Sequence, residues 1–319
     1  MWTPSRSRLQ QTGQGCPPAR DNVPALNRTK MSLNNMMSTS KADSASRIGP
    51  LEHSLLRVMD RSRARVWSMS RASLPAGMTR EQARQALSRL AKAGLVERIE
   101  RGAYVVEPRS GRVPVLPLDL VGAWFEGEPY AVVGGAAAEV HRLTLDTPSI
   151  VEVQVGRRKG PVHFRGNLFT FPLGDQQSVA VDNTTVNVGQ GSCVVASPGK
   201  AVVMLLAHES ARHAGGPRSD ASLVVEMLER GRLRNLWTRT DWRGLVARHA
   251  NSVAARRLGH LLDQLGIAGS DSLLTVRGAS GNKAFSPLYP PVGPVDTRWR
   301  LILNDPSLPS GGRDANTLG

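Results

Sequence analysis

Two acidic residues, Asp146 and Glu152, have the side chains that a metal-dependent nucleic-acid enzyme needs. Nucleotidyltransferases place two carboxylates two residues apart, after a Gly-Gly pair that opens a helix, and these carboxylates hold Mg²⁺. The chain has Gly-Gly at 134–135, but Pro148 stands two residues after Asp146 and cannot bind a metal. A nuclease core needs a Lys two residues after Glu152, where the chain has Gln154. Neither catalytic set is complete, and close helix packing is the favoured interpretation of the Gly-Gly pair. A nucleotidyltransferase or nuclease that uses these two acidic residues is the alternative hypothesis.

The histidines and cysteines give no metal site. His208-Glu209 followed by His213 resembles a zinc-protease helix. However, a spacing of five residues turns the second histidine about 140° around the helix, so one helix face cannot clamp a zinc ion. Cys16 and Cys193 are the only cysteines, and they form neither a Cys-x-x-Cys pair nor a disulfide framework. We therefore predict a protein that is not an enzyme and that binds no metal or cofactor.

The best-defined pattern in the chain predicts a helix that follows Thr79 and ends at Gly94. Thr79 stands where an N-cap belongs, and Gln82 completes a Thr-x-x-Gln capping box. Apolar residues at helical spacing predict the buried face: Ala83, Ala86, Leu87, Leu90 and Ala91. Polar and basic residues occupy the rest of the surface: Arg80, Glu81, Arg84, Gln85, Ser88, Arg89 and Lys92.

Short elements flank this helix on both sides. The elements predicted before it are a helix over 51–61, a strand over 66–69 and a short helix over 70–74, and those after it are strands over 95–99 and 103–106. The first helix is predicted to bury Leu51, Leu55, Leu56 and Met59. Arg101-Gly102 joins the last two strands, because Gly supplies the positive φ of a tight hairpin.

This order of elements is that of a winged helix-turn-helix, which we predict at 49–107. The basic face of the capped helix would enter the major groove, with Thr79 and Arg80 at its start, and Arg98 and Arg101 of the wing would contact phosphates. The predicted DNA-binding residues are Thr79, Arg80, Arg84, Gln85, Ser88, Arg89, Lys92, Arg98 and Arg101. An ordinary solvated helix surface and a winged helix that binds protein are the alternatives.

Charge supports an anionic partner for this region. The net charge of the 319-residue chain is +15, and residues 48–108 hold 11 basic and 6 acidic residues. Residues 1–48 lack any helical or strand period, which predicts a disordered basic tail. Met31, Met36 and Met37 lie inside this tail, so translation can start downstream of Met1. A basic arm that follows DNA is the alternative role for the tail.

The remainder predicts a mixed α/β C-terminal domain at 119–304, so the fold class of the chain is α+β. Prolines and arginines predict a linker at 108–118, and a Pro-, Ser- and Gly-rich end predicts a disordered tail at 305–319. The predicted helices cover 119–125, 135–143, 198–208, 221–230 and 251–265, and the predicted strands cover 150–155, 163–171 and 179–188.

Membrane and secretory segments are absent from the sequence. No apolar run approaches the roughly 18 to 20 residues that a membrane span requires. The N-terminus also lacks the apolar core of a secretory signal. These two observations predict a cytoplasmic protein without a membrane partner.

From about Leu51 to Asn304 the chain is similar to the AbiEi family, antitoxins of type IV toxin-antitoxin systems. The first blocks that carry the resemblance run from Ala86 to Leu95 and from Arg101 to Val105, followed by Tyr130, 135–137 and 141–144. The later blocks are Ala196 to Ala201, Gly215-Gly216, Arg256 to Leu262, and Asp296 through Trp299 to Asn304. The long N-terminal tail departs from the family's usual start near the winged helix.

The resemblance implies an autorepressor that binds inverted repeats in double-stranded DNA at its own promoter. It also implies a C-terminal domain that neutralises a toxin, which is a separate nucleotidyltransferase-like protein. An antitoxin does not need the second carboxylate that the chain lacks near Asp146. The operator sequence, direct contact with the toxin and self-association on DNA are left open by the sequence.

Overall fold

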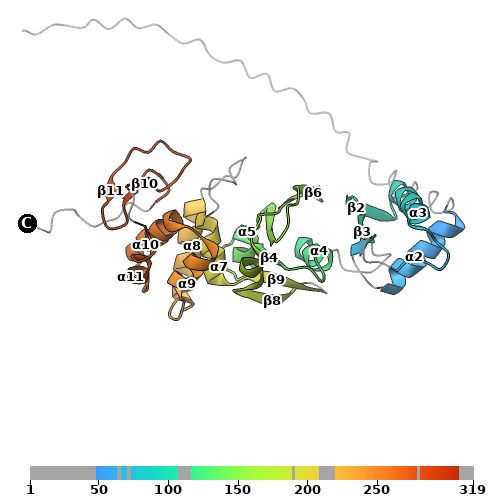
Figure 1. The fold of residues 1–319 in the computed structure, drawn as a ribbon, viewed down its shortest axis with the longest axis horizontal. Coiled ribbons are helices and arrows are strands. Elements are labelled where there is room, and N and C mark those ends of the chain that lie inside the picture. Colours follow the sequence, from blue (N-terminus) through green and yellow to red (C-terminus); the bar gives the residue numbers. More distant parts are fainter. Residues whose placement is uncertain are drawn as a thin grey trace, which may run out of the picture. The chain divides into compact units, whose positions relative to one another are not determined.

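A computed structural model describes residues 48–62, 66–69, 73–106, 116–188, 191–207, 220–278 and 281–308 (Figure 1). Within these residues the fold is mixed α+β, with two three-stranded sheets and one six-stranded sheet. Several predicted features lie wholly or mostly outside them: the tails at 1–48 and 305–319, most of the linker at 108–118, His208, Glu209, His213 and Cys16.

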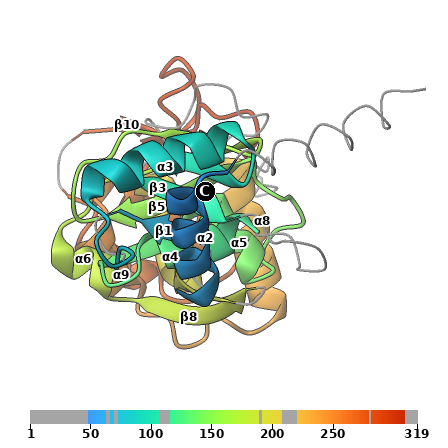
Figure 2. The same ribbon diagram turned by 90° about the vertical axis from the view of Figure 1, so that its right-hand side faces the viewer.

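The N-terminal part consists of two helices and a three-stranded antiparallel sheet. These elements are α2 (Pro50–Ser62), β1 (Val66–Ser68), α3 (Arg80–Lys92), β2 (Val96–Glu100) and β3 (Ala103–Val106), and the strand order is β1-β3-β2. Figure 2 shows α3 running across α2, with which it is in contact. The predicted boundaries of these five elements are confirmed to within a few residues.

One predicted element in this region is wrong over the part that the structure describes. The short helix was expected over 70–74, but Ser73 and Leu74 have no helical structure, and 70–72 lie outside the described residues. Leu74 precedes Pro75, whose ring disfavours helical backbone at the preceding residue. The chain passes through a turn at Ala76-Gly77 and reaches the cap of α3 directly.

The buried face of α2 differs by one residue from the prediction. Leu55, Leu56 and Met59 are buried as expected, whereas Leu51 is 40% exposed and Glu52 is buried in its place. At 100° per residue, Glu52 lies at the centre of the face that the other three define, and Leu51 lies at its edge. A charged residue therefore takes part in the packing of α2.

The predicted caps of α3 are present at both ends. The Gln82 N–H donates to Thr79 Oγ1 (3.2 Å), and the Thr79 N–H donates to Gln82 Oε1 (2.9 Å), which completes the capping box. At the other end Gly94 has a φ of +68°, and the N–H of Leu95 donates to the carbonyl of Leu90 (3.0 Å). This pattern is a Schellman motif, which requires a left-handed residue at the position of Gly94.

The β1-β3-β2 sheet lies between two hydrophobic cores. Trp67, Val96 and Tyr104 pack in a core with α2 and α3. Four other residues of the same sheet belong to the larger core of the chain, which also contains Val121 and Trp124 of α4 (Pro117–Trp124): Val66, Ile99, Ala103 and Val105. Both faces of this small sheet are therefore covered.

A six-stranded sheet with strand order β6-β7-β5-β4-β9-β8 forms the centre of the larger core. Its strands are β4 (Tyr130–Val133), β5 (Ile150–Val155), β6 (Val162–Phe164), β7 (Asn167–Thr170), β8 (Asn183–Val188) and β9 (Gly191–Ala196), and α5 (Gly134–Val140) and α6 (Gln176–Ala180) connect some of them. Strands β4 and β9 pair in parallel, as do β5 and β7, whereas the other pairs are antiparallel.

Three sequence predictions for this sheet are corrected. The strand expected over 163–171 is the β6–β7 hairpin, because Arg165 and Gly166 both take positive φ and turn the chain. The segment expected as a strand over 179–188 begins inside α6, which Asp175 caps, and only β8 is extended. The helix expected over 135–143 ends earlier, at Val140.

Helices follow the six-stranded sheet along the chain: α7 (Pro198–Ala207), α8 (Asp220–Leu233), α9 (Trp242–His249), α10 (Ser252–Gln264) and α11 (Ser270–Leu273). Three short strands come after them: β10 (Lys283–Ala284), β11 (Val295–Asp296) and β12 (Leu301–Ile302). Trp299 is fully buried on α10, where a Cβ at Gly259 would meet its ring at 2.2 Å. Among the described residues no helix has the length and apolar character that a membrane crossing requires.

Candidate nucleic-acid interface

The surface of α3 that faces away from both cores carries polar residues. Ala83, Ala86, Leu87 and Leu90 are buried, and the opposite side of the helix exposes Glu81, Gln85, Ser88 and Lys92. Three of these four residues were predicted to contact DNA. The exposed side can donate and accept hydrogen bonds, and a major groove admits an α-helix.

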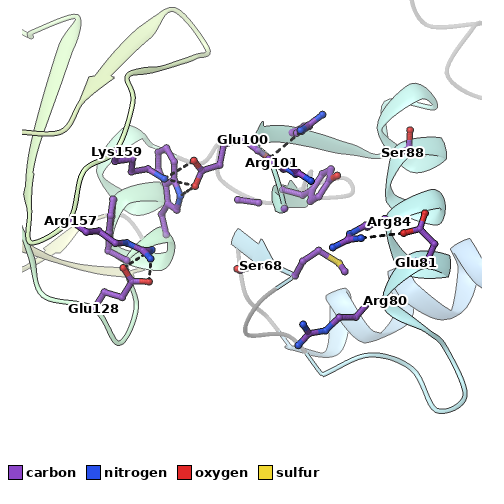
Figure 3. A pocket seen from close by; sticks show the side chains of 17 residues that line it. Ser68, Arg80, Glu81, Arg84, Ser88, Glu100, Arg101, Glu128, Arg157 and Lys159 are labelled. Carbon is purple, nitrogen blue, oxygen red and sulfur yellow. Dashed lines mark hydrogen bonds and ion pairs between the residues drawn. The ribbon is translucent and has the colours of Figure 1, made fainter.

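Thr79 and Arg80 stand at the start of this helix, and both are exposed. The hydroxyl oxygen of Thr79 accepts the cap hydrogen bond from Gln82, so its first role is in the fold. Arg80 lies one residue further on, and its side chain extends into a cleft beside the helix (Figure 3). Of these two residues, Arg80 is the better placed for a phosphate or a base.

Arg84 and Arg89 lie on opposite flanks of α3 and have different partners. Arg84 Nη1 lies 3.2 Å from Glu81 Oε2 in an exposed pair one helical turn apart. Arg89 Nη1 donates to Glu52 Oε1 at 2.8 Å, and the Glu52 side chain is only 4% exposed. Arg89 therefore neutralises a buried carboxylate, whereas Arg84 is held only by a surface pair of small energetic value.

The Glu52 carboxylate is kept ionised in this position. Burial raises the pKa of Glu52, but backbone hydrogen bonds at Glu52 and Gly49, together with Arg89, bring the pKa below its ordinary value. The Arg89 side chain is still 65% exposed, so much of it faces solvent. Arg89 therefore stabilises the packing of α2 on α3 and is also part of the exposed surface of α3.

The β2–β3 hairpin carries Arg98 and Arg101, and both side chains are exposed. Arg98 Nε donates to the carbonyl of Glu100 at 3.2 Å. Gly102 has a φ of +84° and closes the turn directly after Arg101. The prediction of this hairpin is therefore confirmed.

A cleft of about 730 Å³ lies beside α3 and the hairpin (Figure 3). It brings together five of the predicted site residues: Arg80, Arg84, Ser88, Arg98 and Arg101. Thr79, Gln85, Arg89 and Lys92 do not line it. Three carboxylates, those of Glu81, Glu100 and Glu128, also line the cleft.

Sequence reasoning missed two basic residues of this cleft, Arg157 and Lys159, which lie between β5 and β6. Arg157 pairs with Glu128 at 2.9 Å and remains exposed, and Lys159 pairs with Glu100 at 2.5 Å and is only 15% exposed. The run Arg157-Arg158-Lys159 after a strand was the available signal. Nothing in the sequence places this run beside the hairpin, because the two segments are far apart along the chain.

The residues of the alternative enzyme hypothesis lie in different surroundings. Asp146 is exposed in a loop, where its N–H donates to Thr144 Oγ1. Glu152 lies in β5, and its carboxylate is buried against Gly134. A side chain at position 134 would collide with the Glu152 carboxylate oxygen, because its Cβ would overlap it. In the part of the chain that the structure describes, no three His, Cys, Asp or Glu side chains gather as a metal site.

Several residues that carry the family resemblance have packing roles. Lys200 is fully buried, and its ammonium donates to the carbonyls of Ser178 and Val181 and to Asn183 Oδ1; burial lowers its pKa to about 8. His260 Nδ1 lies 2.6 Å from Asp296 Oδ2. These contacts tie the helical end of the chain to its neighbours and involve no exposed reactive group.

The comparisons with known proteins show the fold alone. No protein-family model matches the sequence, and no curated protein matches it. The structure is similar to a crystal structure of the RV2827C protein from Mycobacterium tuberculosis, with a TM-score of 0.51 and 16% sequence identity. The match covers 80% of this chain and 92% of that chain. At this identity the similarity indicates a shared fold and nothing about activity.

Proposed function

We propose that residues 49–107 form a winged helix-turn-helix that binds double-stranded DNA at the protein's own promoter. The observation that carries this proposal is the position of α3: a helix capped at both ends, with an exposed polar face, beside a hairpin that carries Arg98 and Arg101. Helix α3 would read base edges in the major groove, and the two hairpin arginines would bind phosphates.

We further propose that the chain is an AbiEi-like antitoxin and represses its own toxin-antitoxin operon. The support is the resemblance of the sequence blocks described above, together with the polar surface of α3. In this proposal the larger core counteracts a separate nucleotidyltransferase-like toxin in the cytoplasm, and the chain itself is not an enzyme. It needs neither a metal nor a cofactor, because DNA binding depends on side chains already in place.

Arg80 and Arg84 provide the sharpest test of DNA binding, because among the described residues neither pairs with a buried carboxylate. An Arg80→Ala and Arg84→Ala double variant should bind duplex DNA from the upstream intergenic region at least about tenfold more weakly, since a good base contact is worth roughly 1 to 3 kcal/mol. Fluorescence anisotropy at two salt concentrations measures this loss. An Arg239→Ala and Arg243→Ala double variant, which removes two exposed arginines before and within α9, is the matched control. Equal affinities for both variants would show that α3 does not enter the groove.

The antitoxin role has its own test in the gene neighbourhood. Expression of an adjacent nucleotidyltransferase-like gene should arrest growth, and co-expression of this chain should restore it. The alternative enzyme hypothesis predicts instead a metal-dependent nucleotide transfer or cleavage by this chain that Asp146→Ala abolishes. Such an activity in the purified protein would overturn the antitoxin proposal.

A further inference from the structure

Lys159 occupies a site that joins the β2–β3 hairpin to the larger core. Its ammonium donates to both carboxylate oxygens of Glu100, at 2.5 and 2.6 Å, and the Trp124 indole N–H donates to the same carboxylate at 2.7 Å. The ammonium also lies 4.6 Å from the centre of the Trp124 ring and 5.3 Å from that of Phe171. We call Glu100, Lys159 and Trp124 the hairpin clamp.

The hairpin clamp depends on an irregularity in the pairing of β2 with β3. Arg98 lies opposite Tyr104, but Glu100 lies opposite Ala103, so Ile99 is an extra residue on β2. Directly opposed residues share a face of a sheet, and Tyr104 and Ala103 belong to different cores. The bulge therefore turns Glu100 towards the larger core, while Arg98 stays on the face of α3.

Because Lys159 is partly buried, its contacts are stronger than those of an ion pair on the surface. Lys159 is 15% exposed, and three aromatic rings and two carboxylate oxygens surround its ammonium. Cation–π contacts strengthen when the cation is desolvated, and so do ion pairs. Arg101 directly follows Glu100, so the clamp fixes the backbone from which Arg101 extends.

We infer that Lys159 is a positioning residue for DNA binding, which acts through Glu100 by holding Arg101 where it can contact a phosphate. The inference rests on the proposed function, and it makes the larger core a determinant of DNA affinity. Lys159 itself is enclosed by its partners and does not need to touch DNA.

A double-mutant cycle of Lys159→Met with Arg101→Ala tests this inference. Methionine keeps an apolar chain over Trp124 and removes the ammonium. Each single variant should bind promoter DNA about three- to tenfold more weakly. The slope of log affinity against log salt concentration should also fall by the amount expected for about one lost phosphate contact. The double variant should bind no more weakly than Arg101→Ala alone, because a misplaced hairpin has already lost that contact. Lys159→Arg should restore most of the affinity.

Arg158→Ala is the matched control, because it removes a positive charge from the adjacent exposed position and leaves the clamp intact. If Arg158→Ala and Lys159→Met weaken binding equally and each adds fully to Arg101→Ala, these residues act as diffuse charge and the positioning role is overturned. If Arg101→Ala weakens binding while Lys159→Met and Glu100→Gln do not, the positioning role alone fails. An unchanged affinity of Arg101→Ala would remove the hairpin contact of the proposed function and the positioning role with it. Thermal melting of each variant checks that the fold is retained.

Discussion

Arg89 shows how one side chain can serve the fold and the exposed surface together. Its guanidinium neutralises Glu52, which lies at the centre of the buried face of α2, while much of the Arg89 side chain remains open to solvent. The helical pattern predicts that Arg89 is exposed, but it does not reveal the carboxylate beneath it. If the chain binds DNA as proposed, a loss of binding on Arg89 substitution would have two physical sources.

We expect Arg89→Ala to lower the free energy of unfolding by about 1 to 3 kcal/mol, because it leaves a buried carboxylate without its charged partner. Arg84→Ala, the matched control on the other flank of α3, should change it by less than about 0.5 kcal/mol, as exposed pairs usually do. Urea denaturation of both variants measures the difference. Adding Glu52→Gln to Arg89→Ala should recover part of the loss, and an additive further loss would contradict this account.

His141 makes stability depend on pH. Burial lowers the pKa of His141, and the nearby Arg234 lowers it further, against the opposing effect of the Ala196 carbonyl, which lies 2.7 Å from Nε2. A histidine whose folded pKa is depressed contributes stability that is present above its unfolded pKa of about 6.5 and is lost as the pH falls through that value. The melting temperature should therefore fall between pH 7.5 and pH 5.5.

The variant His141→Gln should reduce this fall in melting temperature, measured by differential scanning calorimetry at the two pH values. The exposed His163 is the matched control, because His163→Gln makes the same substitution outside the buried surroundings of His141. His249, whose pKa is also lowered by burial, keeps part of the dependence in both variants. An unchanged pH dependence in His141→Gln would contradict the assignment.

At the scale of elements, substitutions at Thr79 can separate its role as the cap of α3 from the proposed contact with DNA. Thr79→Ala should lower the free energy of unfolding by about 1 kcal/mol, since it removes the acceptor for the Gln82 N–H. Thr79→Asn and Thr79→Asp should both keep the cap, because Asn and Asp are good N-cap residues. Only Thr79→Asp should also weaken DNA binding, through repulsion of phosphates, which anisotropy would detect. Equal affinities of the Asn and Asp variants would place Thr79 away from the DNA.

The elements that could be predicted from the sequence are those with local signals. The cap, period and terminal glycine of α3 are all contained within residues 79–94, and the Arg101-Gly102 turn marks its hairpin. Strands β4 and β9 carry no such marks. The four residues of β4 are all buried, and in the sequence a short apolar run of this kind is compatible with either a strand or a helix. Lys159 was missed because its partner Glu100 lies 59 residues away.

At the scale of the whole molecule, the sheet between the two cores couples their stabilities. Ala103 and Val105 pack on the larger core, and Tyr104 between them packs on the core of α2 and α3. We expect the described parts of the chain to unfold in a single transition, so that tryptophan fluorescence and far-ultraviolet circular dichroism give coincident urea curves. Val105→Ala should shift both curves together. Two separate transitions would show that the cores are independent.

The shared sheet has a practical consequence for anyone who would isolate the proposed DNA-binding part. A fragment that ended after Val106 would leave Val66, Ile99, Ala103 and Val105 without the surface that covers them in the full chain. An uncovered apolar sheet face tends to bind another copy of itself. We expect such a fragment to dimerise or aggregate, so any cooperativity that it showed on palindromic DNA would need comparison with that of the full chain.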